Sequence, residues 1–326
     1  MGRHSHCYHA MVCLMREPVM SELILHHYDL SPFAEKIRLV CGFKQLAWRS
    51  VVIPAVMPKP DYTALTGGYR RTPSLQIGAD LYCDTRLIAE ELEARHPSPT
   101  LYPPDQRGLM QVIVRWAEES FFWSCARTVV GANAEHLPET FHADRAAMRG
   151  HAAPSLTRTR AAGQEAAQQL QPQMRWVEDL LGRGTPYLLG AMPSLADFAL
   201  YHCLWFLEQL PQRLLEHFTR DARVLDWMAR LAAIGHGERT ELTPTEALAI
   251  ARDSSPQALP AHGPGELVPG LPVCVEPEER TSAPVQGTLV CIDARRVVLQ
   301  REDPRAGLVQ VHFPRLGYRV APLLPH

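Results

Sequence analysis

The stretch HYDLSPFAEKIRL, residues 27–39, begins where an apolar segment ends and a helix-like pattern starts. Ser31 stands directly before Pro32 at this point. Serine caps the free amides at the start of a helix, and proline is tolerated in the first turn. The pair therefore predicts the start of a helix, and capping alone is sufficient to explain the hydroxyl.

The segments on either side of this helix predict a small mixed sheet. Apolar runs at 22–28 and 48–53 predict strands before and after the helix at 32–43. Residues 72–83 hold two short apolar runs around a turn, which indicates a hairpin, and residues 85–96 predict another helix. The predicted order is β-α-β followed by β-β-α.

After this predicted sheet, the sequence pattern changes first to that of helices and then, beyond a linker, to that of strands. Helical apolar spacing dominates after the YPPD segment at 102–105, and Ser194 stands three residues before Asp197, as in a capping box. Residues 253–270 are rich in Pro and Gly, which is typical of a linker. Beyond the linker, apolar and polar residues alternate with period two, which predicts three to five strands.

Composition narrows the function classes. The chain of 326 residues has a net charge of -2, which leaves no broad basic face for a nucleic acid or an anionic membrane. The eight cysteines are scattered without a C-x-x-C pair, which is typical of reduced thiols in the cytoplasm. We find no apolar run of about 18 residues and no signal-peptide core. We expect a cytoplasmic protein without a metal site.

Four motifs, in the right order and spacing, resemble the glutathione transferases. They are SPFAEKIR (31–38), RRTPSL (70–75), DTRLI (84–88) and LLGAMPSLADF (188–198). The Ser-Pro-Phe form is similar to the serine-type classes such as tau, at the position where omega-type members have cysteine. The resemblance implies an α+β protein with a thioredoxin-like domain followed by an all-helical domain.

The domain boundaries expected from these patterns cover the whole chain. They are an N-terminal extension at 1–20 that is disordered or an artefact of start-site choice, a thioredoxin-like glutathione-binding domain at 21–103, an all-helical domain at 104–250, a linker at 251–265 and a small β-barrel-like module at 266–326.

The chemistry implied by the resemblance centres on Ser31. A cysteine thiol with a pKa of about 8.5 is mostly protonated at neutral pH, and lowering that pKa by about two requires about 2.7 kcal/mol. A hydrogen bond from Ser31 to the charged sulfur contributes about 1.5 to 3 kcal/mol, and the helix N-terminus about 0.3 to 1 more. Tyr28 is the runner-up, because other classes use a tyrosine near the end of the first strand.

The resemblance also assigns residues to the remaining parts of glutathione. Thr72 and Pro73 would form a cis-proline corner whose backbone binds the cysteinyl part. Asp84 and Thr85 would bind the γ-glutamyl amino and carboxylate groups, although Asp84 is equally a good helix cap.

Two cations and a group of aromatic residues complete the expected site. Arg71, with Lys59 as a second cation, would hold the glycyl carboxylate, although either can equally be an idle surface residue. The wall of the electrophile pocket is expected on the first long helix, with some candidates belonging to the core instead. These candidates are Arg115, Trp116, Phe121, Phe122 and Trp123.

The resulting hypothesis is a glutathione transferase, active as a homodimer in detoxification, that conjugates glutathione to a small electrophile. Glutathione is its co-substrate, and no metal, nucleic acid or membrane is expected. The identity of the electrophile stays open. Alternatives are a glutathione-dependent reductase or lyase of the same fold, against which Ser31 argues, and a non-catalytic glutathione-binding regulator or interaction protein.

Overall fold

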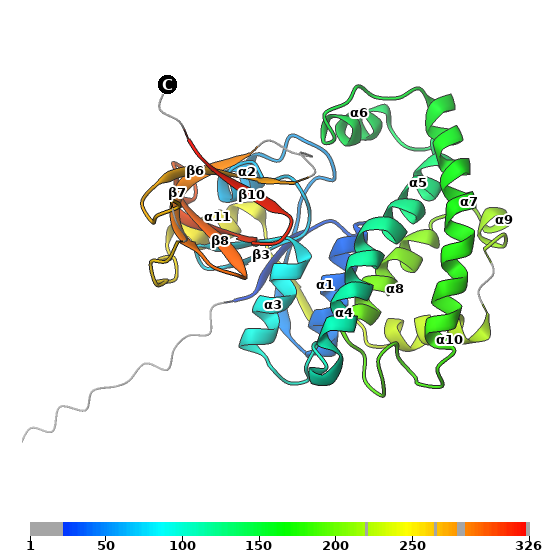
Figure 1. The fold of residues 1–326 in the computed structure, drawn as a ribbon. Helices are drawn as coiled ribbons and strands as arrows, with labels where there is room; N and C mark the ends of the chain where they lie inside the picture. The colour runs from blue at the N-terminus through cyan, green and yellow to red at the C-terminus, as the bar shows by residue number, and fades with distance from the viewer. Residues whose placement is uncertain (1–21, 219–220, 264–265, 279–283, 324–326) are drawn as a thin grey trace, which may run out of the picture.

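The computed structural model describes residues 22–218, 221–263, 266–278 and 284–323. Figure 1 shows a part rich in strands beside a part built of helices. The extension predicted at residues 1–20 lies outside the described residues. None of the helices in the described ranges is long and apolar enough to cross a bilayer.

The first elements of the chain follow the predicted order, except for one additional short helix at residues 60–66 that was not predicted. They are β1 (Ile24–His27), α1 (Pro32–Phe43), β2 (Ala47–Val52), α2 (Pro60–Thr66), β3 (Ser74–Ile77), β4 (Asp80–Cys83) and α3 (Thr85–Arg95). β1 pairs in parallel with β2 and antiparallel with β3, and β3 forms a hairpin with β4. This confirms the predicted β-α-β and β-β-α units.

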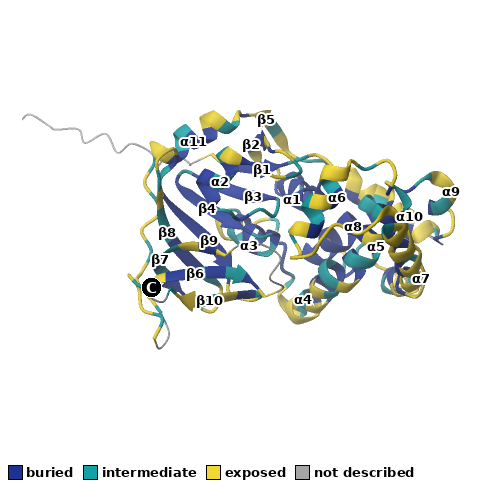
Figure 2. Ribbon diagram, turned by 90° about the horizontal axis from the view of Figure 1, so that it is seen from above, coloured by how far each residue is buried: buried dark blue, intermediate teal, exposed yellow. Residues whose placement is uncertain are grey.

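The helical part surrounds one central helix. Its elements are a short 3-10 turn (Pro104–Gln106), α4 (Arg107–Trp116), a π turn (Ala117–Phe121), α5 (Phe122–Ala132), α6 (Glu139–Ala147), α7 (Leu156–Leu181), α8 (Leu195–Leu207), α9 (Gln212–Leu215) and α10 (Ala222–Ala232). Gly131 of α5 and Gly163 of α7 let these helices approach closely, because a Cβ on Gly131 would lie 2.6 Å from the Cα of Gly163. Almost all of α8 is buried, so it forms the centre of this part (Figure 2).

Residues 238–252 do not belong to the helical part, contrary to the predicted boundary at residue 250. They form β5 (Glu238–Glu241), which pairs in parallel with β2, and α11 (Pro244–Arg252). Ala247, Leu248 and Ala251 of α11 are buried in the core that lies on the sheet. The apolar face of α11 therefore finds its partner on the sheet rather than among the helices.

The C-terminal strands continue the same sheet. They are β6 (Pro272–Pro277), β7 (Val285–Ile292), β8 (Arg296–Asp303), β9 (Gly307–Pro314) and β10 (Tyr318–Pro322). β9 pairs in parallel with β4, and the whole sheet has the order β10-β6-β7-β8-β9-β4-β3-β1-β2-β5. The expected number of strands is confirmed, whereas the expectation of a separate barrel-like module is wrong.

The predicted linker also takes part in the sheet. The backbone amide of Gln257 donates to Asp80 Oδ2 at 2.8 Å, and the amide of Ile292 donates to the His262 carbonyl at 2.8 Å. The other carboxylate oxygen, Asp80 Oδ1, lies 2.8 Å from Nε2 of the buried His312. Burial lowers the pKa of His312, so the neutral ring donates this hydrogen bond. The C-terminal strands are thus tied to β4 by side chains as well as by backbone.

Candidate functional site

Most of the predicted site residues line one large cleft. It has a volume of about 1630 Å³ and lies between the sheet, the face of α5 and the segment around α6. Ser31, Tyr28 and the residues expected to bind glutathione all border this cleft: Lys59, Arg71, Thr72, Pro73, Asp84 and Thr85. The fold therefore brings together residues that lie up to 57 positions apart, from Tyr28 to Thr85.

Ser31 begins α1 at the floor of the cleft. Its Oγ accepts a hydrogen bond from the amide of Ala34 at 3.3 Å, and its own amide donates to the carbonyl of Tyr28 at 3.0 Å. The side chain is buried. Capping uses its oxygen only as an acceptor, so the hydroxyl proton remains available to donate a hydrogen bond. A thiolate placed beside Ser31 would receive that proton as a hydrogen bond and would face the positive end of the helix.

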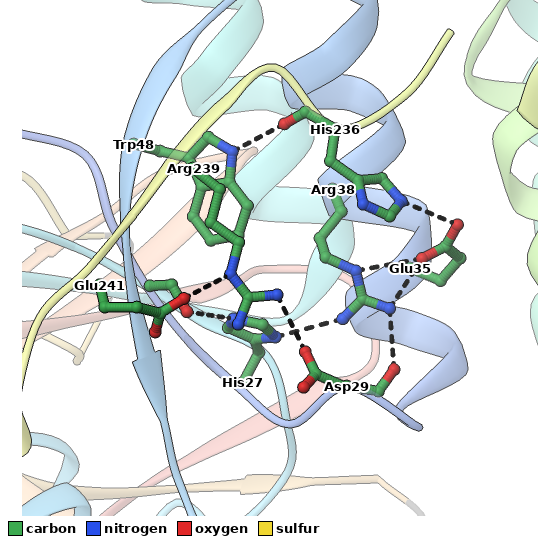
Figure 3. Close-up of polar contacts among 9 residues, drawn as sticks. His27, Asp29, Glu35, Arg38, Trp48, His236, Arg239 and Glu241 are labelled. Atoms are coloured by element: carbon green, nitrogen blue, oxygen red, sulfur yellow. Dashed lines mark hydrogen bonds and ion pairs between the residues drawn. The ribbon is translucent and has the colours of Figure 1, made fainter. Parts of the chain in front are cut away.

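The loop that carries Ser31 is held from behind by a polar network (Figure 3). Arg38 Nη2 donates to the backbone oxygen of Asp29 at 2.9 Å and to Glu35 Oε2 at 2.7 Å. Arg239, from β5, donates to Asp29 Oδ1 at 3.0 Å. Two guanidinium groups thus fix the residue that stands two positions before Ser31.

His27 is a neutral member of this network. Burial, followed by the charge of Arg38, lowers its pKa to about 3. Arg38 Nη1 lies 3.1 Å from His27 Nδ1, and because a guanidinium can only donate, Nδ1 is the acceptor. The proton is therefore on Nε2, which donates to Ser50 Oγ at 3.0 Å. This tautomer links β1 to β2 directly beneath the loop.

Next to Ser31, the Thr72–Pro73 corner contains the predicted cis peptide bond. Lys59 Nζ lies behind this corner and donates to the carbonyl of Arg70 at 3.3 Å and to Thr72 Oγ1 at 3.4 Å. Burial, and then the charge of Arg145, lowers the pKa of Lys59 to about 8. Arg71 borders the same end of the cleft and is half-buried.

Asp84 and Thr85 form the start of α3 on the far side of this corner. Asp84 has φ 75°, in the left-handed region that non-glycine residues rarely adopt, and its Oδ1 accepts from the amide of Arg86 at 3.0 Å. Thr85 Oγ1 accepts from Lys36 Nζ at 3.0 Å. An ammonium can only donate, so the Thr85 hydroxyl proton is left to point elsewhere and can donate to a ligand carboxylate.

The sequence prediction missed the contribution of Lys36 and Glu118. Lys36 is fully buried and forms an ion pair with Glu118, which comes from the π turn of the helical part. This pair places Lys36 against Thr85 and so connects the helical part to the start of α3. The signal was the charge of Lys36 within an otherwise apolar helix face, for which no partner was evident along the sequence.

Tyr28 borders the cleft beside a residue of α6 that the prediction also missed. Arg145 Nη2 donates to the Tyr28 hydroxyl oxygen at 3.2 Å, and both its terminal nitrogens donate to the carbonyl of Ala55 at 3.1 Å. Asp144 accepts from the amide of Met57 at 2.9 Å. The segment around α6 therefore docks on the loop before α2 and covers one end of the cleft.

The predicted electrophile wall is partly wrong. Phe122 borders the cleft, as do Trp123 and Phe141, but Trp116 and Phe121 do not. Phe121 is completely buried in the core, and Trp116 points to α7, where its Nε1 donates to Gln173 at 3.2 Å. The reason is the π turn at 117–121, which shifts the helix phase between the two halves of the predicted helix.

Among the described residues, no group of three or more His, Cys, Asp or Glu side chains is arranged to hold a metal ion. The cleft instead presents a capping hydroxyl, a carboxylate and several cations. These groups match an anionic, thiol-bearing peptide with a free amino group.

Comparisons with known proteins agree with this fold. Residues 25–100 match the family model of the glutathione S-transferase N-terminal domain, and residues 160–232 match that of the C-terminal domain. A solved GST-like protein from Pseudomonas syringae is 39% identical, with a TM-score of 0.76, over 93% of this chain and 100% of its own. That coverage extends past both family matches and so includes C-terminal strands.

Two further relatives are more distant. FtsZ-localized protein A of Caulobacter vibrioides is 27% identical over 183 residues, which is 55% of this chain and 74% of that protein. A theta class glutathione S-transferase from Xanthomonas axonopodis pv. citri, solved with glutathione bound, has a TM-score of 0.52 at 21% identity over 68% of this chain and 99% of its own, and shares the fold. With its two matched domains and its P. syringae relative, the chain belongs to the glutathione transferase superfamily.

Proposed function

We propose that the protein is a glutathione transferase in which Ser31 stabilises the glutathione thiolate for attack on a small electrophile. The observation that carries this proposal is the convergence of Ser31, the cis Thr72–Pro73 corner and the Asp84–Thr85 pair on one cleft. Each supplies what one part of glutathione needs: a proton donor for the sulfur, free backbone groups for the cysteinyl amide, and a carboxylate with a hydroxyl for the γ-glutamyl end.

The electrophile would bind against the aromatic face opposite Ser31. Phe122 and Trp123 of α5 and Phe141 of α6 border that side of the cleft. Phe33, directly after Ser31 and Pro32, packs on Phe122 with 4.6 Å between ring centroids. This places an apolar surface beside the sulfur position. We propose that the protein acts as a cytoplasmic homodimer in detoxification.

Replacing Ser31 tests the proposal directly. Ser31→Ala is expected to raise the pKa of the bound thiol by about one to two pH units, equivalent to about 1.4 to 2.7 kcal/mol, because the sulfur loses its hydroxyl donor. Conjugation of a chloronitrobenzene at about pH 7 should fall about three- to twenty-fivefold, because the thiolate fraction falls as the pKa rises from about 6.5 to between about 7.5 and about 8.5, while glutathione affinity stays nearly unchanged. The measurement is the ultraviolet thiolate absorbance of the complex, titrated against pH.

Tyr28→Phe is the matched control, because it removes the rival hydroxyl from the same cleft. It should leave the thiol pKa in place. If Tyr28→Phe moves the titration midpoint and Ser31→Ala does not, the role belongs to Tyr28.

The lowered pKa of Lys59 predicts that glutathione binding depends on pH. If its ammonium holds the glycyl carboxylate, a pKa near 8 means that the charge is present below that pH and is lost above it. The affinity for S-methylglutathione, which has no thiol to titrate, should fall about fourfold between about pH 7 and about pH 8.5. Isothermal titration calorimetry at several pH values gives the profile. Lys59→Met should bind more weakly at neutral pH and should lose the fall in affinity centred near pH 8, and a profile that is unchanged in this variant would exclude Lys59.

A second candidate function is favoured by one relative. The similarity to FtsZ-localized protein A supports a non-catalytic role as an interaction protein that is localised with FtsZ. A fluorescent fusion of the full chain that co-localises with FtsZ, together with no conjugation by the purified protein, would favour this role. Diffuse fluorescence and conjugation that depends on Ser31 would favour the transferase.

A further inference from the structure

The C-terminal strands reach the cleft at its γ-glutamyl end. Residues on the loop between β9 and β10 and at the end of β6 border the cleft there; they are Pro277, Glu278, Leu316, Gly317 and Tyr318. The amide of Glu278 donates to the carbonyl of Gly317 at 3.0 Å, which joins the two segments. Neither family-model match includes these residues. This edge of the cleft is thus built by the part of the chain that was expected to stand apart.

Tyr318, the first residue of β10, contacts Asp84 directly. Its hydroxyl lies 3.2 Å from Asp84 Oδ2, and the hydroxyl of Tyr69 lies 3.4 Å from that of Tyr318. An aspartate carboxylate can only accept, so Tyr318 donates to it, and Tyr69 in turn donates to the Tyr318 oxygen. Burial raises the pKa of both tyrosines well above 10, so both keep their protons.

The two tyrosines are held rigidly. Tyr318 is only 2% exposed and Tyr69 only 3%. The ring of Phe313, on β9, packs on both, with centroids 5.9 Å from Tyr69 and 5.5 Å from Tyr318. The packing of β9 and β10 on the N-terminal part of the sheet therefore fixes the direction of the hydrogen bond from the Tyr318 hydroxyl to Asp84.

Two hydrogen bonds from described residues orient the Asp84 carboxylate. Its backbone has a positive φ, and the amide of Arg86 bonds only to Oδ1. The Tyr318 hydroxyl takes one acceptor position on Oδ2. A carboxylate has about four acceptor positions, so about two remain for a ligand.

We propose that Tyr318 is a positioning residue for glutathione: it fixes the Asp84 carboxylate so that the remaining acceptor positions receive the ammonium of the γ-glutamyl group. The C-terminal strands thereby complete the glutathione site. This inference rests on the proposed function, because it requires that Asp84 binds the amino group of glutathione.

The test compares two ligands on the full chain. Tyr318→Phe removes only the hydroxyl and should weaken binding of S-methylglutathione about five- to twentyfold, since a hydrogen bond that orients a charged group is lost. A matched ligand in which a glutaryl group replaces γ-glutamate lacks the α-amino group. Its affinity, already weak for the unmodified protein, should be the same for Tyr318→Phe. Calorimetric titration measures both.

Two further variants sharpen the result. Tyr102→Phe is the matched control, because its buried hydroxyl makes no hydrogen bond within the described ranges, and it should leave both affinities unchanged. In an Asp84→Asn background, Tyr318→Phe should have no additional effect on S-methylglutathione. Tyr69 is one hydrogen bond farther from Asp84, so Tyr69→Phe should lower the affinity for S-methylglutathione by a smaller factor. Thermal melting of each variant shows whether it is folded.

The outcomes separate this inference from the proposed function. If Tyr318→Phe binds S-methylglutathione as tightly as the unmodified protein does, or if it loses the same factor for both ligands, Tyr318 does not position Asp84 and the inference is overturned alone. If the unmodified protein binds neither ligand, the proposed function is overturned and this inference with it.

Discussion

Ending the chain after Asp253 is expected to abolish glutathione binding and to leave most of the shortened protein insoluble. The cut removes β9 from β4, so the backbone groups of β4 that pair with residues 310–312 become an unprotected sheet edge. It also uncovers the apolar core shared by α2, α11 and the C-terminal strands. Asp80 loses both Gln257 and His312 as hydrogen-bond partners. The domain boundaries expected from the sequence imply the opposite, because they place every predicted glutathione-binding residue before the linker at 251–265.

The measurement is the soluble fraction of residues 1–253, followed by calorimetric titration of that fraction with glutathione. The matched control is co-expression of residues 254–326 as a second chain, which should restore solubility and binding by rebuilding the β4–β9 pair. Residues 254–326 alone should lack a folded core, because much of their apolar face packs on α2 and α11. A soluble 1–253 fragment with the affinity of the full chain would mean that the C-terminal strands are an accessory.

The N-terminal part of the site could be predicted because its signals are local. Ser31 caps a helix that begins at the next residue, and Asp84 does the same for α3. The cis corner also depends on neighbouring residues, together with a family resemblance. In each case the residue types within a few positions decide the backbone conformation. Only the fold was then needed to bring these positions to one cleft.

The C-terminal strands could not be placed because the pairing of β4 with β9 joins residues 230 positions apart, such as Asp80 and Gln310. One signal was available. In a sheet that ended at β4, the strand Asp80–Cys83 would be an edge, yet Leu81, Tyr82 and Cys83 carry no charge. Edge strands are usually protected by charged residues, so this sequence favoured a further strand beside β4.

Two residues of the predicted electrophile wall, Trp116 and Phe121, do not border the cleft, and the physical reason is different. The apolar spacing over residues 108–131 is that of one continuous helix, in which every third or fourth residue lies on one face. The π turn at 117–121 adds a residue to one helical turn and rotates the residues after it relative to those before it. Trp116, before the turn, contacts α7, and Phe121, at its end, is buried in the core, whereas Phe122 and Trp123 border the cleft. Such a turn is stabilised by tertiary contacts, here including the ion pair of Glu118 with Lys36.

Asp197→Ala is expected to reduce the free energy of unfolding by about 4 kcal/mol, more than any other single substitution proposed for this chain. The fully buried carboxylate accepts four hydrogen bonds: from the amide and hydroxyl of Ser194 at 2.9 Å each, from the amide of Leu188 at 2.9 Å and from Trp227 Nε1 at 3.0 Å. Removing the acceptor leaves buried donors unsatisfied, at about 1 to 3 kcal/mol each. The expected fall in melting temperature is about 6 °C, because a chain of 326 residues unfolds with an entropy of about 0.7 kcal/mol/K.

The four donors come from three places, which separates Asp197 from an ordinary helix cap. Ser194 begins α8, Leu188 lies in the turn before it, and Trp227 belongs to α10. Ser194→Ala removes only the capping hydroxyl and should cost about 1 kcal/mol. Asp226→Ala, an exposed aspartate beside Trp227 on α10, should leave stability unchanged and is the matched control. Urea denaturation of the three variants gives the comparison. If Asp197→Ala lowers the free energy of unfolding no more than Ser194→Ala does, the carboxylate acts only as part of the cap and α10 is held by its apolar contacts. If the loss is several times larger, the carboxylate that helps to cap α8 also fixes α10 against it.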